Sequence, residues 1–252
     1  MPEAIQNRQL TAEDYAYRFP DHWLLDERTD IGAMMHHAYV QRVIEIVARS
    51  GARRVIEVGC GDGWNCGQLA ERDLEVVGVD WSRNAIAYAK QLVPKARFHC
   101  GDIRDSEFIQ RFAEPFDAAI LVEVIEHIPP ADCVAAVREI RNLIRPGGTF
   151  VLTTPSVNFP NDNPQHYRHF TEQVLRDLVA EAEGLEILDI EGYGDVKVED
   201  WHWRLARFVN NRFYTIHPLY HRLTERYRRH CLGSSLDRCH GFIMTMRRSA
   251  QQ

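Results

Sequence analysis

The feature that most constrains this fold is a regular alternation of strand-like and helix-like segments, which begins near residue 34. Short runs rich in valine and isoleucine alternate with longer segments whose apolar residues recur at helical spacing. We expect strands at 53–59, 74–80, 96–102, 116–123, 149–155, 185–194 and 240–249, and helices at 34–51, 62–72, 83–93, 131–144 and 171–184. This alternation predicts an α/β fold, in which helices cover both faces of a parallel sheet.

Composition narrows the class of protein. No apolar stretch approaches the roughly 20 residues that span a bilayer, so we expect no transmembrane segment. The N-terminus lacks the apolar core of a signal peptide, and the six cysteines lack the spacing of a zinc site or a disulfide framework. We therefore expect a cytoplasmic protein with reduced thiols.

The net charge of −6 is unevenly distributed along the chain. Residues 201–248 contain ten arginines but only Glu225 and Asp237, so this segment carries +8 and the remainder carries −14. The asymmetry predicts that the C-terminal segment meets something different from what the rest of the chain meets.

A glycine-rich turn follows the first predicted strand, in "VIEVGCGDGWN". Gly59, Gly61 and Gly63 permit a tight turn and let the backbone approach a ligand closely. Their spacing is G-x-G-x-G, whereas dinucleotide oxidoreductases, the first competing class, use G-x-G-x-x-G to hold a pyrophosphate.

Acidic side chains surround this turn. Glu57 precedes it, Asp62 interrupts it, and Asp80 ends the second strand at about the interval at which an acid reaches a ribose hydroxyl. Two acids around a phosphate cradle, here Glu57 and Asp62, would repel phosphate. They suit a ligand that is cationic there, such as the sulfonium and amino group of S-adenosylmethionine.

With these motifs, the chain resembles the class I S-adenosylmethionine-dependent methyltransferases. The segments "EVGCGDG", "GVDWS", "GDI" and "EVIEHI" carry the likeness, which covers roughly residues 35–192 and 238–246. The E-x-x-EH motif after the fourth strand is similar to that of the ubiquinone-type O-methyltransferase group. The resemblance implies a Rossmann-like, doubly wound sheet of seven strands with the last strand antiparallel. It also implies cofactor-binding roles for Glu57, Gly59, Gly61 and Gly63 near the methionine moiety, Asp80 on the ribose, Asp102 with Ile103 on the adenine, and Cys60, Trp81 and Glu123 beside them.

The stretch "VEVIEHIPP" places two carboxylates and an imidazole at the end of a buried strand. In a helical turn, Glu123, Glu126 and His127 would share one face, and Pro129 would end the turn. Such a turn could supply oxygen and nitrogen ligands for Mg²⁺, Mn²⁺ or a similar divalent metal. We therefore predict a metal set of Glu123, Glu126, His127 and His166, with His169 as a further catalytic candidate.

The small-RNA 2′-O-methyltransferases form a second resemblance, since they combine a related E-x-x-EH motif with a distal histidine at a catalytic metal. Two other interpretations stay open for the same residues. His127 could act as a general base without a metal, because an imidazole titrates near neutral pH. Alternatively, the three side chains could have structural roles only.

Two regions lie outside the motifs. We expect residues 1–33 to form an N-terminal strap or lid, in which Tyr15, Tyr17, His22 and Trp23 could close over the cofactor. The methyltransferase domain then covers 34–252. Its aromatic and arginine-rich insertion at 193–236 is predicted to cap the acceptor side of the site. Peripheral membrane contact and a helical subdomain with an aromatic core are the alternatives for this insertion.

These observations predict an S-adenosylmethionine-dependent O-methyltransferase that acts on a hydroxyl of a small molecule or glycan, and the arginines favour an anionic or ring-bearing acceptor. A metal-dependent RNA 2′-O-methyltransferase is the second hypothesis, although the chain is acidic overall and shows no separate RNA-binding module. A cofactor-binding subunit without activity is the third.

Overall fold

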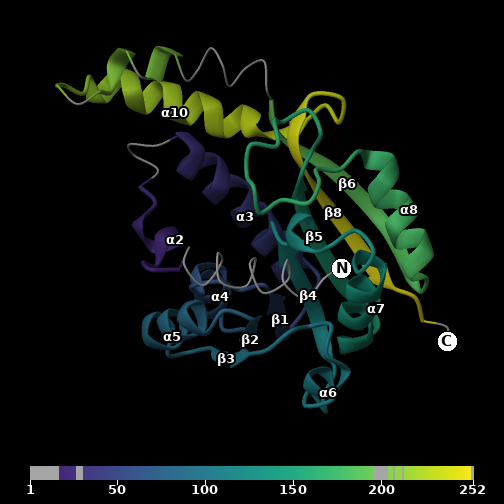
Figure 1. Cartoon of the computed structure of the whole chain (residues 1–252). Helices are drawn as coiled ribbons and strands as arrows, with labels where there is room; N and C mark the ends of the chain where they lie inside the picture. The colour runs from purple at the N-terminus through teal and green to yellow at the C-terminus, as the bar shows by residue number, and fades with distance from the viewer. Residues whose placement is uncertain (1–16, 27–30, 196–203, 207, 212, 251–252) are drawn as a thin grey trace.

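The structure is a computed structural model that describes residues 17–26, 31–195, 204–206, 208–211 and 213–250 (Figure 1). These residues form a sheet of eight strands in the order β3-β2-β1-β4-β5-β8-β6-β7. The strands are β1 Arg54–Val58, β2 Glu75–Asp80, β3 Arg97–Cys100, β4 Phe116–Val122, β5 Ile144–Pro155, β6 Leu185–Asp195, β7 Leu232–Ser234 and β8 Cys239–Arg248.

The first five strands pair in parallel, and β8 lies antiparallel between β5 and β6. The predicted doubly wound sheet with an antiparallel last strand is therefore confirmed. The short β7, which pairs with the end of β6, makes the sheet eight strands wide where seven were predicted.

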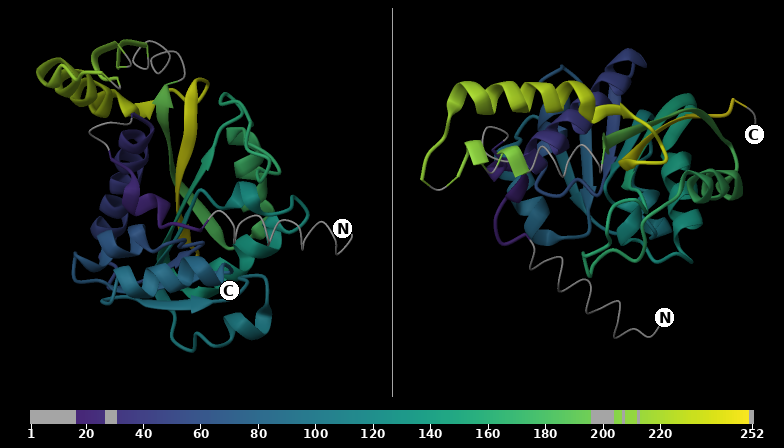
Figure 2. Two further views of the ribbon diagram at one scale, coloured as in Figure 1. Left: turned by 60° about the vertical axis from the view of Figure 1, so that its left-hand side comes forward. Right: turned by 90° about the horizontal axis from the view of Figure 1, so that it is seen from above.

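Helices cover both faces of the sheet, and each face has its own hydrophobic core (Figure 2). On one face lie α3 Ile31–Arg49, α4 Trp64–Ala70 and α5 Arg83–Leu92, and on the other lie α6 Ser106–Ile109, α7 Cys133–Leu143 and α8 Glu172–Ala182. Strand residues that are neighbours in sequence, such as Val55 and Ile56, belong to opposite cores. This is the period-two alternation of a strand that is buried on both faces.

Local sequence signals set several helix boundaries. The Ser82 hydroxyl accepts a hydrogen bond from the Ala85 amide at 3.2 Å, and the Thr171 hydroxyl accepts one from the Val174 amide at 3.2 Å. Both are N-caps of the kind that serine and threonine provide. β5, in contrast, begins at Ile144, whereas the sequence predicted a strand only from 149. Its first residue pairs with Phe116, and a register shift follows before the regular pairing with β4.

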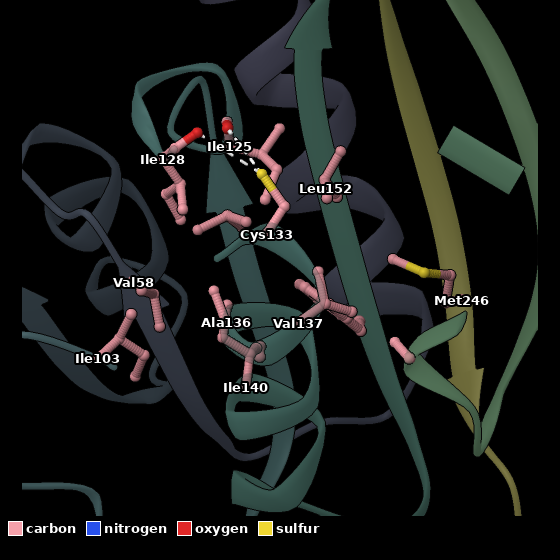
Figure 3. Close-up of a cluster of buried hydrophobic side chains, with 14 of the residues drawn as sticks. Val58, Ile103, Ile125, Ile128, Cys133, Ala136, Val137, Ile140, Leu152 and Met246 are labelled. Carbon is pink, nitrogen blue, oxygen red and sulfur yellow. Dashed lines mark hydrogen bonds between the residues drawn. The ribbon is translucent and has the colours of Figure 1, made fainter. Parts of the chain in front are cut away.

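The core under α7 supports the strand ends at which the candidate site lies (Figure 3). Ile140 is fully buried in it, and the Cys133 thiol donates weak hydrogen bonds to the carbonyls of Ile125 at 3.8 Å and Ile128 at 3.6 Å. These bonds attach the short 3₁₀ turn η1, Ile125–His127, to the first residue of α7.

The insertion places one helix, α10 His217–Cys231, against α3. Tyr220 and Tyr227 are 5% and 2% exposed and form a third small core with Met34 and Ala38 of α3. The burial of both tyrosines therefore agrees with a helical subdomain that has an aromatic core, one of the alternatives for this insertion. Trp201 and Trp203 lie outside the described residues. No helix in the described part of the chain is both long enough and apolar enough to cross a membrane.

Candidate functional site

A cavity of about 520 Å³ opens at the carboxyl ends of the parallel strands. Crevices at this edge are where ligands bind in open α/β sheets. Of the predicted site residues, Gly59, Cys60, Gly61, Asp80, Trp81, Asp102, Ile103, Glu123 and His127 line it. Glu57, Gly63, Glu126, His166 and His169 do not.

The glycine turn after β1 is closely packed against other parts of the wall. Gly59 has φ +72°, and a Cβ there would lie 2.3 Å from a methyl group of Val124. Gly61 has φ +52°, and a Cβ there would lie 2.5 Å from the Tyr17 hydroxyl. Both positions thus require glycine for its positive φ and for the lack of a side chain.

Asp80 braces this turn from the end of β2. Its Oδ2 accepts a hydrogen bond from the Gly61 amide at 2.9 Å, and its Oδ1 accepts one from the Ser82 amide at 2.8 Å. Both carboxylate oxygens thus hold backbone amides of the turn, and the side chain lines the cavity.

Glu57 is fully buried behind the cavity wall. Its carboxylate accepts hydrogen bonds from the Asn65 side-chain amide at 2.7 Å and the Cys66 thiol at 2.9 Å. Burial raises the pKa of Glu57 to about 7, although the two hydrogen bonds oppose the rise. Glu57 therefore reaches the cavity through Asn65, which lines it.

At the end of β3, Asp102 lines the cavity but is already engaged by arginine. Arg104 donates to both carboxylate oxygens of Asp102, with its shortest contact at 2.6 Å, and it also reaches Asp132 at 3.0 Å. Burial alone would raise the pKa of Asp102, but the hydrogen bonds from Arg104 outweigh burial and lower it.

The described residues 17–26 of the N-terminal segment contribute to the cavity wall. Asp62, which is fully buried, accepts a hydrogen bond from the His22 amide at 2.9 Å and pairs with His22 Nδ1 at 3.1 Å. The Trp23 indole donates to the Asp62 carbonyl at 3.2 Å, and Tyr17 and His22 line the cavity. Tyr15 lies outside the described residues.

Glu123, the first residue after β4, has φ +54°. A positive φ at a residue other than glycine costs energy and needs support from its surroundings. That support is visible, because Glu123 Oε1 accepts hydrogen bonds from the Thr153 hydroxyl at 2.8 Å and the Tyr193 hydroxyl at 2.8 Å. Burial raises the pKa of the carboxyl group.

The remaining acidic residue of the motif, Glu126, belongs to a second group of side chains. Donor atoms of Glu126, His127 and His166 all lie within 4.8 Å of one another, a spacing that could hold a metal ion, and Glu123 is not part of this group. Glu126 is fully buried. One of its carboxylate oxygens accepts from the Thr154 hydroxyl at 3.1 Å, and Oε1 has no hydrogen-bond partner among the described residues. Burial and then the charge of Glu123 raise the pKa of Glu126 well above normal.

His166, a member of this group, also contacts His169, and the two rings form a hydrogen-bonded relay. His169 Nδ1 lies 3.0 Å from the Phe159 carbonyl, which can only accept, and His169 Nε2 lies 2.9 Å from His166 Nδ1. With neutral rings, His169 must donate to the carbonyl and accept from His166, which leaves the lone pair of His166 on Nε2. Burial lowers the pKa values of His127 and His166 to about 4, so both rings are neutral at neutral pH.

Sequence reasoning missed three aromatic residues in or beside the cavity wall. His36 and Tyr39 of α3 line the cavity, and the His36 Nδ1 and Tyr39 hydroxyl are 2.8 Å apart. The Tyr39 ring stacks on Tyr193 with a centroid distance of 4.3 Å. The pair of adjacent histidines in "MMHHAY" was the available signal, because histidine is uncommon on the apolar face of a helix.

None of the described residues of the insertion after position 195 lines the cavity. The predicted substrate cap therefore stays a prediction.

The known proteins that this chain is similar to are methyltransferases. Residues 55–148 match the model of a family described as "Methyltransferase domain". A ubiquinone biosynthesis O-methyltransferase of Alkalilimnicola ehrlichii is 32% identical over 117 residues, which are 46% of this chain and 44% of that protein. A probable S-adenosylmethionine-dependent methyltransferase of Mycolicibacterium smegmatis is 28% identical over 163 residues, 62% of this chain and 60% of that protein. The match thus covers less than two thirds of each relative.

Solved structures are similar in fold at low sequence identity. The magnesium protoporphyrin IX methyltransferase of Synechocystis, solved with bound S-adenosylmethionine, has a TM-score of 0.59 at 17% identity and aligns over 96% of this chain and 97% of its own. A small RNA methyltransferase has a TM-score of 0.61 at 18% identity over 85% of this chain and 25% of its own. Residues 55–148 thus match a methyltransferase domain, and the fold around them is similar to that of solved S-adenosylmethionine-dependent methyltransferases.

Proposed function

We propose that this chain is an S-adenosylmethionine-dependent O-methyltransferase that methylates a hydroxyl of a small molecule or glycan. One observation carries the proposal: a single cavity joins the glycine turn and Asp80 at one side to Glu123 and His127 at the other. A cofactor held at the first side would therefore face an acceptor held at the second. The names of the ubiquinone O-methyltransferase relatives support oxygen as the methylated atom.

The residues present fit the cofactor. The cavity volume of about 520 Å³ lies within the range of small-molecule sites. Gly59 and Gly61 line the cavity, and Asp80 presents a carboxylate there that suits a ribose diol. The acidic wall at Asp62 and Glu123 suits a ligand with a positive sulfonium and amino group better than it suits a pyrophosphate.

The chemistry asks for alignment first. S-adenosylmethionine supplies a methyl group on a good leaving group, so the protein mainly has to hold the acceptor oxygen in line with that methyl carbon. In this proposal Glu123, which Thr153 and Tyr193 hold in position, orients the acceptor hydroxyl. His127 is neutral at neutral pH and can accept the hydroxyl proton, a contribution typically worth about 10²–10⁴-fold in rate.

Glu126, His127 and His166 also fit a divalent metal, which we propose as the alternative to a metal-free site, because His127 cannot be a metal ligand and a base at the same time. Glu126 Oε1 is a buried carboxylate oxygen without a partner among the described residues, and the relay leaves His166 Nε2 with a lone pair. Such a metal would lower the pKa of an acceptor hydroxyl. Two imidazoles with one carboxylate favour Mn²⁺ or a later transition ion over Mg²⁺.

Calorimetry with S-adenosylhomocysteine tests the cofactor half of the proposal. We expect micromolar binding to the wild type and at least about tenfold weaker binding to Asp80→Ala, because the variant loses both the brace on the turn and the ribose acceptor. Asp177→Ala, at an exposed position on α8, is the control and should bind like the wild type. Absence of binding to folded wild-type protein would reject the proposal.

Methyl transfer tests the other half. The purified chain, incubated with extracts and with donor labelled in its methyl group, should transfer label to a low-molecular-weight fraction. Transfer mainly to RNA would favour the 2′-O-methyltransferase hypothesis instead. No transfer to any fraction, with cofactor binding intact, would favour the subunit without activity.

Titration with Mn²⁺ in the absence of cofactor tests the metal. His166→Ala should lower the affinity at least about tenfold, because it removes one of three ligands. His99→Ala on β3 is the matched control. Unchanged Mn²⁺ binding in His166→Ala would remove the metal from the proposal and leave His127 as a base.

A further inference from the structure

The turn that precedes α10 exposes a group of large apolar side chains. Five of them lie between positions 208 and 219, and their exposed fractions are 66% for Phe208, 77% for Phe213, 48% for Tyr214, 42% for Ile216 and 40% for Leu219. Scattered exposed apolar residues are ordinary, but five large ones in one short segment are a concentration that points to an interaction surface. We call these five residues the apolar tip.

The apolar tip is built on an ordered turn. Asn210 and Thr215 form a β-bridge, the Asn211 amide donates to the Tyr214 carbonyl at 3.0 Å, and the Tyr214 hydroxyl donates to the Phe208 carbonyl at 3.0 Å. The Ile216 amide donates to the Val209 carbonyl at 2.8 Å. These bonds hold the backbone while the rings stay in solvent. The turn lies at the end of α10 that is farthest from the sheet (Figures 1 and 2).

The outer face of α10 is strongly basic. Tyr220, Leu223 and Tyr227 face α3, whereas Arg222, Arg226 and Arg229 are exposed on the other side. A shallow hollow on this face is lined by His221, Arg222, Glu225, Arg226, Arg229 and His230. Residues 204–231 contain seven arginines and one glutamate, a charge of +6, in a chain whose total charge is −6. The rest of the chain therefore carries −12.

We propose that the apolar tip and the basic face of α10 dock this chain onto an anionic lipid surface. The tip inserts its aromatic rings at the level of the headgroups, where aromatic and aliphatic side chains bind, and the arginines contact the lipid phosphates. The acidic remainder of the chain keeps the other faces away from the membrane. This proposal does not depend on the proposed function, because it uses none of the residues of the cavity.

Shape and charge favour a lipid surface over a protein partner or RNA. The tip projects from the body, and a projecting apolar group inserts into a soft interface without a matching groove, whereas a protein partner must supply one. RNA would use the arginines, but it gives no role to the aliphatic side chains of Ile216 and Leu219. A helix that spans the membrane is not required, because the contact is interfacial.

Vesicle flotation of the full chain tests the proposal. Vesicles of phosphatidylcholine with about a third phosphatidylglycerol should float the wild type at low salt, and pure phosphatidylcholine should float at least about tenfold less. The triple variant R222E/R226E/R229E should bind anionic vesicles at least about 100-fold more weakly. The double variant F208S/F213S should bind anionic vesicles at least about tenfold more weakly than the wild type. Both variants change exposed side chains, and circular dichroism with S-adenosylhomocysteine binding verifies their folds.

Matched controls separate the site from general charge and hydrophobicity. R49E/R72E/R83E makes the same change in net charge at exposed positions elsewhere, and V157S removes an exposed apolar side chain from another loop. Both should float like the wild type, apart from the small general effect of net charge. Equal losses in the control and the α10 variants would overturn the proposal.

Two further outcomes would also overturn it. One is tight binding of a short RNA that R222E/R226E/R229E abolishes, with no flotation of the wild type. The other is a dimer in sedimentation velocity that F208S/F213S converts to a monomer, again without flotation. Flotation that competes away with millimolar inorganic phosphate alone would assign the hollow to a free anion, and it would likewise contradict a lipid surface.

Discussion

The hydroxyl of Tyr193, in β6, donates a 2.8 Å hydrogen bond to Glu123 at the end of β4, across 70 positions of sequence. Glu123 is the one site residue with a strained backbone, at φ +54°, and Tyr193 is 1% exposed. The cavity wall on the acceptor side is thus held by a contact between two strands that are not neighbours in the sheet.

Tyr193→Phe should destabilise the protein by about 1–2 kcal/mol, because it leaves a buried carboxyl group with one hydrogen bond fewer. Urea unfolding measures the change. Tyr214→Phe removes a hydroxyl that bonds a carbonyl on the exposed turn, and it should cost at most about 0.5 kcal/mol. Equal costs for the two variants would show that the bond to Glu123 adds no stability.

Gly59→Ala and Gly233→Ala separate backbone strain from steric exclusion. Both glycines have φ +72°, but a Cβ at Gly59 would collide with Val124, whereas a Cβ at Gly233 would meet no described atom within 4 Å beyond its own chain neighbours. Gly233→Ala should cost about 1–2 kcal/mol from conformation alone. Gly59→Ala should cost more and should also abolish binding of S-adenosylhomocysteine. Retained affinity in Gly59→Ala would contradict the role of the turn.

The pH dependence of stability should reveal Glu57. Its pKa is about 7 in the folded protein and near 4.5 in the unfolded chain, so the folded state holds the extra proton between these values. The stabilisation is complete below pH 4.5 and is lost as the pH rises through 7. Between pH 5 and pH 8 the free energy of unfolding should fall by about 2–3 kcal/mol more in the wild type than in Glu57→Gln. Parallel curves for the two proteins would place the Glu57 pKa near its ordinary value.

The pKa of His22, in the N-terminal segment, should depend on Asp62. Burial lowers the pKa of His22, but the hydrogen bond and charge of Asp62, with the charges of Glu57 and Asp21, outweigh burial and raise it above 6.5. Asp62→Asn should therefore lower the His22 pKa, as an NMR titration of the imidazole can measure. Asp21→Asn, which removes a weaker contribution, should shift it less. A larger shift in Asp21→Asn would mean that Asp62 does not hold the strap.

The sequence by itself determined the sheet, the glycine turn and most of the cofactor side of the site. Each of these depends on residues close together along the chain: alternation makes a strand, Ser82 caps the helix that follows it, and glycine permits the positive φ at position 59. The carboxyl ends of parallel strands meet at one edge, so Asp80, Asp102 and Glu123 could be placed around one cavity before any coordinates were known.

Only the tertiary structure decided which of the E-x-x-EH residues lie together. An ideal helical turn would place Glu123 beside Glu126, but the positive φ at Glu123 sends it to Thr153 and Tyr193, and Glu126 joins His127 and His166. Likewise, spacing alone could not assign Tyr220 to a core against α3 and Phe213 to solvent. The physical reason is that such contacts join side chains tens of residues apart, and their distances depend on strand order and helix packing, which local periodicity does not encode.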